Sequence, residues 1–379
     1  MDFNLTEEQL RFGEVVASFV DKEVAPLADE LDKKGEFPRS LFKRIGDLGY
    51  YGLRYPEEYG GANADLVTFC LFLEEMARGS LSVAANTAMQ CLMGTHFLYR
   101  LGNEELKERL LKPALRGEKV AAFSLTEPGA GSDLGAMTTR AVRQGDHYLL
   151  NGSKTWLTSG TVADFITVAA RTKEDTGLKG IALFLLERDY PGVTIGKKIP
   201  KLGVWGQECT ELFLENCMVP KENLLGDEDS GFLYIKDILD EIRVITGALS
   251  LGLAQAALQA SCVYAGERVA FGRPIKKFQG ISFKLAEVAT ELEAARRLVY
   301  YAAWRHDQGL ANVKEAAMAK LFASEVAVRA ADESTRIFAS YGFAMEYPAQ
   351  RFFRDARFLL YGAGTSEILK VIISQELDK

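Results

Sequence analysis

The stretch Phe123–Asp133 is a glycine-rich loop that also carries hydroxyl groups, with two glycines between Thr126 and Ser132. Glycine lets backbone amides approach a ligand closely, and hydroxyls can hydrogen-bond to it. The loop can therefore cradle the edge of a flavin ring and a pyrophosphate. A Rossmann fingerprint fits less well, because the third glycine, Gly135, comes one residue late and a β-domain follows in place of a βαβ unit. An ordinary glycine-rich turn is the alternative for the loop taken alone.

Cysteine and histidine give no sign of metal or disulfide chemistry. The sequence has five widely spaced cysteines without a CxxC pair, and only three histidines. An odd, scattered set of cysteines does not make a disulfide framework, and no group has the spacing of zinc ligands. We expect no metal site.

Charge and hydropathy exclude other classes of protein. The formal net charge is -7 and the basic residues are scattered, so we expect no nucleic-acid surface. The N-terminus lacks the features of a signal peptide, and no apolar run reaches the ~18 to 20 residues that cross a bilayer. We expect a cytoplasmic protein without membrane insertion, and its 379 residues allow two or three domains around a cofactor.

Three segments of different periodicity must position the loop. Residues 1–120 have helical periodicity, and Thr6 with Gln9 forms a capping box at the first helix. Residues 121–230 contain short runs rich in β-branched and aromatic residues between turn signals, which predicts a small antiparallel β-domain. Residues 231–379 return to long helical stretches, which are expected to pack as an antiparallel bundle. The predicted fold class is mainly α with a β middle domain.

Four sequence blocks carry a resemblance to a known family. In chain order they are Phe123–Asp133, Lys154–Ser159, Glu267–Ile275 with Phe278 and Gln279, and the C-terminal pair Arg354–Arg357 and Gly364–Ile368. Together they span nearly the whole chain and resemble the FAD-dependent acyl-CoA dehydrogenases. The resemblance implies an N-terminal helical domain, a small antiparallel β-barrel and a C-terminal four-helix bundle.

The resemblance also implies the flavin contacts. Thr126 and Thr158 would hydrogen-bond the isoalloxazine ring, and Trp156 would pack on it. Arg268 resembles the arginine that binds the FAD pyrophosphate of a neighbouring subunit, so the flavin site is expected to need a dimer, within a homotetramer that is a dimer of dimers. The implied FAD contacts are Phe123, Leu125, Thr126, Gly131, Ser132, Trp156, Thr158, Arg268, Phe271, Gln279, Arg336, Ser340, Thr365 and Glu367.

The block near the adenine end of the flavin departs from the family pattern. The family commonly has Gln-x-x-Gly-Gly-x-Gly there, whereas this chain has Arg336-Ile337-Phe338-Ala339-Ser340-Tyr341-Gly342. The adenosine contacts are therefore expected to differ, with main-chain contacts surviving the exchange.

The carboxylate that removes the substrate's α-proton is missing from its usual place. In the family, this proton leaves to a glutamate while the β-carbon gives a hydride to the flavin. That glutamate normally lies in Tyr-Glu-Gly-Thr, where this chain has Ala363 followed by Gly364. The second known position, directly before an arginine on a helix, holds Ile242 before Arg243.

Two residues are candidates for a relocated base. Glu241 adjoins Ile242, but each helical step turns the side chain by about 100°, so a solvated or ion-paired helix residue is the alternative. The expected pocket-lining segment, residues 86–97, contains no Asp or Glu, and its titratable groups are Cys91 and His96. A buried thiol without a cationic neighbour is a poor base, so Cys91 is also explained as a packed apolar residue and His96 as a structural one.

The sequence thus predicts an unusual FAD-dependent acyl-CoA dehydrogenase. The exchanges at Ala363 and Ile242 leave apolar space near the α-carbon, which favours a branched or alicyclic acyl group oxidised to an enoyl- or dienoyl-CoA. The implied substrate contacts are Ser132, Asp240, Arg243 and Gly364. An electron-transferring flavoprotein is the expected acceptor by family analogy. The alternatives are a non-catalytic FAD- or CoA-binding subunit of a heteromeric enzyme, and an enoyl-CoA reductase, which would still need a proton donor.

Overall fold

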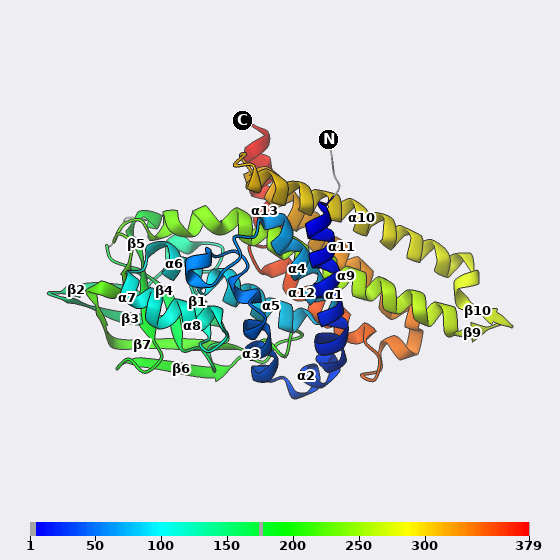
Figure 1. The fold of residues 1–379 in the computed structure, drawn as a ribbon, viewed down its shortest axis with the longest axis horizontal. Coiled ribbons are helices and arrows are strands. Elements are labelled where there is room, and N and C mark those ends of the chain that lie inside the picture. The colour runs from blue at the N-terminus through cyan, green and yellow to red at the C-terminus, as the bar shows by residue number, and fades with distance from the viewer. Residues whose placement is uncertain (1–4, 174–176, 379) are drawn as a thin grey trace.

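The computed structural model describes residues 5–173 and 177–378. A helical part, a β part and a second helical part follow one another along the chain (Figure 1). This is the order that the hydrophobic periodicity predicts.

Helices form the first part, and the first of them starts at the capping box that the sequence predicts. The capping box is present, because the Gln9 amide donates to Thr6 Oγ1 at 3.2 Å and the Thr6 amide donates to Gln9 Oε1 at 3.0 Å. Asp65 caps α4 in the same way, accepting from the Thr68 amide at 2.7 Å. The helices are α1 (Glu7–Phe19), α2 (Ala28–Lys34), α3 (Arg39–Asp47), α4 (Leu66–Gly79), α5 (Leu81–Ala88), α6 (His96–Leu101), α7 (Glu104–Leu106) and α8 (Lys112–Leu115).

The middle part is a mixed sheet and not the purely antiparallel one that was predicted. Its strand order is β6-β7-β3-β2-β4-β5-β8, and β1 pairs with β4 in parallel. β1 and β4 are buried along their whole length, as is typical of parallel pairs, which are covered on both faces. The strands are β1 (Ala121–Ser124), β2 (Arg140–Gln144), β3 (His147–Thr158), β4 (Phe165–Arg171), β5 (Ile181–Glu187), β6 (Val193–Lys198), β7 (Cys209–Pro220) and β8 (Leu224–Leu225).

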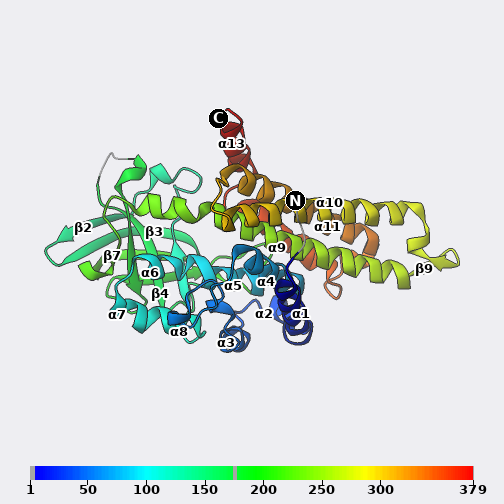
Figure 2. The ribbon, with the colours of Figure 1, turned by 45° about the horizontal axis from the view of Figure 1, so that its top comes forward.

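The last part is a helical bundle built around α9, which packs along α11 and α4. Figures 1 and 2 show α9 running from the β-domain to a hairpin at the far end of the molecule, while α13 projects from the body. The elements are α9 (Gly231–Glu267), β9 (Val269–Ala270), β10 (Arg273–Pro274), α10 (Gln279–Asp307), α11 (Val313–Phe338), α12 (Ala349–Tyr361) and α13 (Ser366–Leu377).

Helix α9 is by length and composition apolar enough to cross a membrane, although its sequence contains no unbroken apolar run of that length. Thr246, Ser250 and Gln255 interrupt that run. In the structure 78% of the helix's most apolar window is buried. Its composition is therefore explained by its place in the protein core.

Candidate active site

A buried ion pair fixes the glycine-rich loop after β1. Lys154 Nζ lies 2.8 Å from Glu127 Oε1, with side chains 0% and 2% exposed. Lys154 also donates to the Leu125 carbonyl at 3.2 Å, and Glu127 accepts from the amides of Thr138 at 2.7 Å and Thr139 at 2.9 Å. Because every bond crosses between the loop and a neighbouring segment, the network holds the loop against the sheet.

The ion pair shifts the pKa of both partners. Burial alone would raise the pKa of Glu127, but the charge of Lys154 and the hydrogen bonds outweigh it and lower the pKa to about 2. Burial lowers the pKa of Lys154 to about 8, although Glu127 acts in the opposite direction. Glu127 is therefore a structural anion and not a proton acceptor at neutral pH.

Trp156 is presented to solvent by an irregularity in β3. The register between β3 and β7 shifts between Lys154 and Leu157, and Trp156 has a φ of 59°. Its side chain is 53% exposed, and the amide of the preceding Thr155 donates to the Thr126 carbonyl at 2.9 Å. A flat aromatic surface thus lies beside the loop and its hydroxyl.

This edge of the β-domain fits a flavin. Trp156 offers a face for the ring, and the hydroxyls of Thr126 and Ser132, together with Thr158 at the end of β3, are donors suited to the ring's nitrogen and oxygen edge. Phe123 is buried in β1, and its ring lies 5.0 Å from that of Phe97. Phe123 therefore stabilises the start of the loop by packing in the core, and its ring is not exposed to a ligand.

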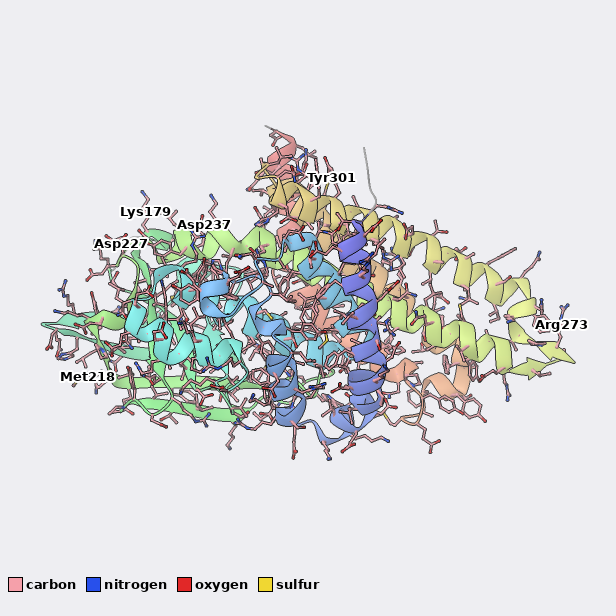
Figure 3. All side chains as sticks on the ribbon, viewed as in Figure 1. Lys179, Met218, Asp227, Asp237, Arg273 and Tyr301 are labelled. Carbon is pink, nitrogen blue, oxygen red and sulfur yellow. The ribbon has the colours of Figure 1, made fainter. Side chains whose placement is uncertain are left out.

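The other predicted flavin residues lie elsewhere in the chain. Arg268 and Phe271 flank β9 at the tip of the bundle, where Phe271 is 95% exposed. Figure 3 labels Arg273 at this tip, at the end of the molecule away from the β-domain. Arg268 lies over the ring of Tyr341, 5.9 Å from its centre. Within one subunit, Arg268 and Trp156 are therefore far apart. This separation is expected if Arg268 contacts the flavin of a neighbouring subunit.

The remaining predicted contacts lie near that tip, at the start of α13 or in the glycine-rich loop. Gln279 begins α10, Ser340 is exposed after α11, and Arg336 is ion-paired with Asp332 at 2.8 Å. The Thr365 hydroxyl caps α13 by accepting from the Ile368 amide at 3.3 Å. Glu367 is exposed on the first turn of α13, and Gly131 is exposed in the loop.

Ala363 lies in a tight turn between α12 and α13. Ala363 and Gly364 have φ values of 60° and 99°. The ammonium of Lys320, which is fully buried in α11, donates to the Gly364 carbonyl at 2.7 Å. The hydrogen bond from Lys320 therefore stabilises the turn. The partly buried methyl group of Ala363 packs against the main hydrophobic core.

Helix α9 carries three further residues of the predicted site, Asp240, Ile242 and Arg243. Ile242 is buried, and Arg243 is 9% exposed and bonded to Asp240 at 2.6 Å. Burial raises the pKa of Asp240, against the influence of Arg243. Burial is also the main reason that the pKa of Lys320 falls to about 8, and the charge of Arg243 lowers it further.

Glu241, the first candidate base, is ion-paired with a buried arginine on a different side of α9. Its carboxylate pairs with Arg54 and lies 3.7 Å from His306 Nε2. Arg54 is itself buried, with its guanidinium 5.5 Å from the centre of the Phe69 ring. An ion-paired carboxylate is a weak proton acceptor, so this geometry favours the ion-paired alternative.

Cys91, the second candidate base, is also unsuited to the role. Its thiol donates to the Tyr50 carbonyl at 3.7 Å, and burial raises its pKa far above the usual range. Burial lowers the pKa of His96 to about 3, with Arg54 adding to the effect. Both residues are therefore neutral at physiological pH, and neither accepts a proton readily.

Sequence reasoning missed Arg54 and Lys320. Neither lies in a recognisable motif, and a lysine or arginine on a helix or loop is exposed in most proteins. The one available signal is the apolar surroundings of Lys320 in the sequence Ala-Met-Ala-Lys-Leu-Phe-Ala. Among the described residues, no group of histidine, cysteine and acidic side chains could hold a metal ion, and all cysteines are free.

Comparison with known proteins defines the class. Sequence models of the acyl-CoA dehydrogenase N-terminal, middle and C-terminal domains match residues 6–118, 122–217 and 229–377. The chain therefore belongs to the acyl-CoA dehydrogenase family, whose members are FAD-dependent oxidoreductases.

Individual relatives cover the whole chain. It is 51% identical, over 100% of both chains, to the benzylmalonyl-CoA dehydrogenase of Aromatoleum aromaticum. It is 39% identical to the butyryl-CoA dehydrogenase of Megasphaera elsdenii, with a TM-score of 0.96 over 100% of both chains. A TM-score of 0.96 and 40% identity also relate it to a chain in a structure of the electron transferring flavoprotein of Acidaminococcus fermentans, covering 100% of this chain and 99% of that one.

Proposed function

We propose that this acyl-CoA dehydrogenase acts on thioesters whose α-carbon is branched or part of a ring, and not on straight-chain acyl groups. The observation that carries the proposal is the replacement of the usual glutamate by Ala363, together with a buried Ile242 at the second known position. Both known positions of the glutamate therefore hold an apolar side chain in this protein. A substituent on the α-carbon can occupy the space that remains.

Different residues of the chain would bind the flavin, polarise the thioester and exclude water. The Trp156 edge would hold the flavin, which accepts a hydride from the substrate's β-carbon when it is bound. The backbone N–H of Ala363 would polarise the thioester carbonyl, because the hydrogen bond from Lys320 to the Gly364 carbonyl stabilises the turn. The apolar wall at Ile242 would keep water away from the α-carbon.

The name of the relative from Aromatoleum aromaticum supports a substrate that is branched at the α-carbon. The benzylmalonyl-CoA in its name is a malonyl thioester that carries a benzyl group on the α-carbon. At 51% identity over the full length, this relative supports a related substrate class for this chain. Function still depends on the site and not on the fold alone.

We also propose that the protein works as a homotetramer and passes its electrons to an electron-transferring flavoprotein. The distance between β3, which carries Trp156, and β9, which Arg268 directly precedes, supports a site shared between subunits (Figure 1). The match to a chain from the Acidaminococcus flavoprotein structure supports the electron acceptor.

An anaerobic titration of the FAD-loaded protein tests the substrate class. We expect loss of the flavin's visible absorbance with 2-methylbutyryl-, cyclohexanecarboxyl- or 2-substituted malonyl-CoA, and slow or no loss with butyryl- and octanoyl-CoA. Rapid bleaching by the straight-chain thioesters would overturn the proposal. Absence of bleaching by every thioester would favour a non-catalytic subunit.

A further inference from the structure

We propose that Lys320 is a positioning residue for the oxidation of the thioester, and that its positive charge polarises the substrate's carbonyl group through the turn at Ala363. The inference rests on the proposed function, because it takes the backbone N–H of Ala363 as the donor to that carbonyl. It differs from support of the turn, since it assigns the effect to the charge and not to the hydrogen bond alone. It is carried by the burial of the ammonium group, by its acceptors, and by the helix end that it faces.

Lys320 carries its ammonium group in the interior of the protein. Its side chain is one of the largest that are fully buried, with 0% of the residue exposed. Placing a charge in such surroundings is costly, and a lysine that only packed α11 against its neighbours would be replaced at no loss by an apolar residue of similar length. The buried lysine is therefore better explained by the effect of its charge on the groups around it.

Both acceptors of Lys320 are backbone carbonyls of the segment that forms the turn. Its Nζ donates to the Gly364 carbonyl at 2.7 Å and to the Leu360 carbonyl at 3.4 Å. Neither acceptor carries a formal charge, so these hydrogen bonds satisfy the ammonium group without cancelling its charge. The positive charge thus lies directly against the turn.

Charged groups of three helices influence Lys320. Burial has the largest effect and lowers its pKa to about 8, Glu325 of α11 and Glu367 of α13 act in the opposite direction, and Arg243 of α9 lowers the pKa further. Glu325 accepts a hydrogen bond from the Ser366 hydroxyl at 2.9 Å, and Glu367 is exposed to solvent. Lys320 is therefore charged at neutral pH and loses its charge at moderately alkaline pH.

The C-terminal end of α12 is the group that the charge acts on first. The last carbonyls of a helix carry a partial negative charge, which a cation in the last turn often offsets. The last turn of α12 contains no basic residue, and the helix ends at Tyr361, two residues before Ala363. Lys320 of α11 donates to the Leu360 carbonyl at this end and therefore takes the place of that cation.

Negative charge on the thioester oxygen would develop close to this helix end. When the bond at the α-carbon breaks, the carbonyl oxygen shares the electron pair that remains, so the charge on this oxygen grows during the reaction. The negative end of α12 opposes that charge, and the ammonium group of Lys320 offsets the opposition. Because Ala363 stands where the family has a glutamate, no negative side chain at this position weakens the effect of Lys320.

A bound thioester that cannot be oxidised measures the polarisation directly. The probe is pivaloyl-CoA with an isotopically labelled carbonyl carbon, because its α-carbon is branched and has no hydrogen. We expect the carbonyl NMR resonance to move downfield when the probe binds to the FAD-loaded protein, and Lys320→Met to lose most of this shift. The control Lys314→Gln, which changes a lysine of α11 that is 39% exposed, should retain the shift.

The probe also separates failure of the inference from failure of the proposed function. A probe that binds without the shift, or an equal shift in Lys320→Met, would overturn the role of Lys320 and leave the proposed function intact. If the unmodified protein binds neither this probe nor any other α-branched thioester, the proposed function is wrong, and the inference with it.

The pH dependence of the shift distinguishes the charge from the hydrogen bond. A neutral amine can still donate to the Gly364 carbonyl, but it has no charge. We expect the shift to decrease as the pH rises through about 8 in the unmodified protein, and to be independent of pH in Lys320→Met. That variant retains Lys154, whose pKa is also about 8, and so controls for it. A constant shift in the unmodified protein would overturn the inference even if the variant did not fold.

The rate of flavin reduction shows whether the polarisation serves the reaction. At saturating 2-methylbutyryl-CoA, we expect Lys320→Met to slow the reduction by about tenfold to thirtyfold, the effect of a charge at a partly buried helix end. The affinity for pivaloyl-CoA should change little, because the charge on the oxygen is largest during the reaction. Flavin content and urea unfolding verify the fold of the variant. An unchanged rate in the folded variant, or equal losses of rate and affinity, would contradict the role of Lys320.

Discussion

Three residues at the predicted ligand contacts hold a backbone conformation that is unfavourable for any side chain. Trp156, Phe271 and Ala363 have φ values of 59°, 50° and 60°, each at a cost of about 1 to 2 kcal/mol. Two of them are also exposed, Trp156 by 53% and Phe271 by 95%. An exposed aromatic side chain on a strained backbone gains little from folding alone, so its position is better explained by a bound ring or a neighbouring subunit.

Trp156→Ala should therefore weaken flavin binding more than it weakens the fold. Removing an exposed side chain changes the free energy of unfolding by about 0.5 kcal/mol or less. Losing its stacking on the ring should weaken FAD binding up to about tenfold. Flavin retention after gel filtration and urea unfolding measure the two effects. Trp304→Ala, which removes a tryptophan that is 46% exposed on α10, is the control. Equal flavin loss in both variants would contradict the assignment.

Glu127 predicts a pH dependence of stability. Its pKa is about 2 in the folded protein and 4.5 as the ordinary value. The folded pKa is the lower one, so the stabilisation is present above pH 4.5 and is lost as the pH falls from 4.5 towards 2. Unfolding by urea across this range should show a loss of roughly 2 to 3 kcal/mol from this group. Glu127→Gln should remove that part of the slope, and the exposed Glu8→Gln should not. Identical slopes in all three proteins would refute the role of Glu127.

At the scale of elements, charged side chains join the parts of the chain to one another. Asp355 in α12 accepts a hydrogen bond from the Val204 amide, and Arg354 pairs with Asp32 of α2 while lying 3.9 Å from the centre of the Trp205 ring. This C-terminal block carries the family resemblance, yet its side chains hold α2, α12 and the loop before β7 together. A sequence motif of this kind therefore reports on packing as well as on ligand contacts.

The Glu241 ion pair is expected to matter for stability and not for proton transfer. It joins α9 to Arg54, which follows α3 in the chain. Glu241→Gln leaves Arg54 buried without its carboxylate and should lower the free energy of unfolding by about 3 kcal/mol. Flavin reduction by substrate should slow less than tenfold, whereas loss of a general base costs about 100-fold or more.

Arg54→Met combined with Glu241→Leu is the matched control for that experiment. Replacing both partners by apolar residues leaves no buried charge unpaired, so much of the lost stability should return. A double variant that folds well but no longer reduces its flavin would show that Glu241 is a base after all.

The sequence predicted the elements better than the contacts between them. Long helices such as α9 follow from periodicity, and the caps at Thr6 and Asp65 follow from local hydrogen bonding. The parallel pairing of β1 with β4 was not predictable, because it joins segments that are distant in the chain. Arg54 was missed for the same reason, since its burial depends on a partner in α9. The vacant position at Ala363 was visible because it lies within a motif.

At the scale of the whole molecule, the predicted flavin contacts fall at two separated places. The β-domain and its Trp156 edge lie on one side of the bundle, and the hairpin with Arg268 and Phe271 lies at the other end (Figures 1 and 3). If both places contact one flavin, the site is complete only in a symmetric assembly in which each subunit contributes to the site of its partner. The proposed dimer of dimers satisfies this requirement.

Mixing two variants that each bind flavin more weakly tests that arrangement directly. Arg268→Ala damages the contribution to the partner's flavin, and Trp156→Ala damages the chain's own edge. In a mixed dimer one site carries both defects and the other carries none. Random pairing makes half of the dimers mixed, so about a quarter of all sites should regain full flavin binding. Co-expression with separate affinity tags, followed by flavin quantification, measures this fraction. Two variants that act within one chain would leave every site defective, and no mixture would recover.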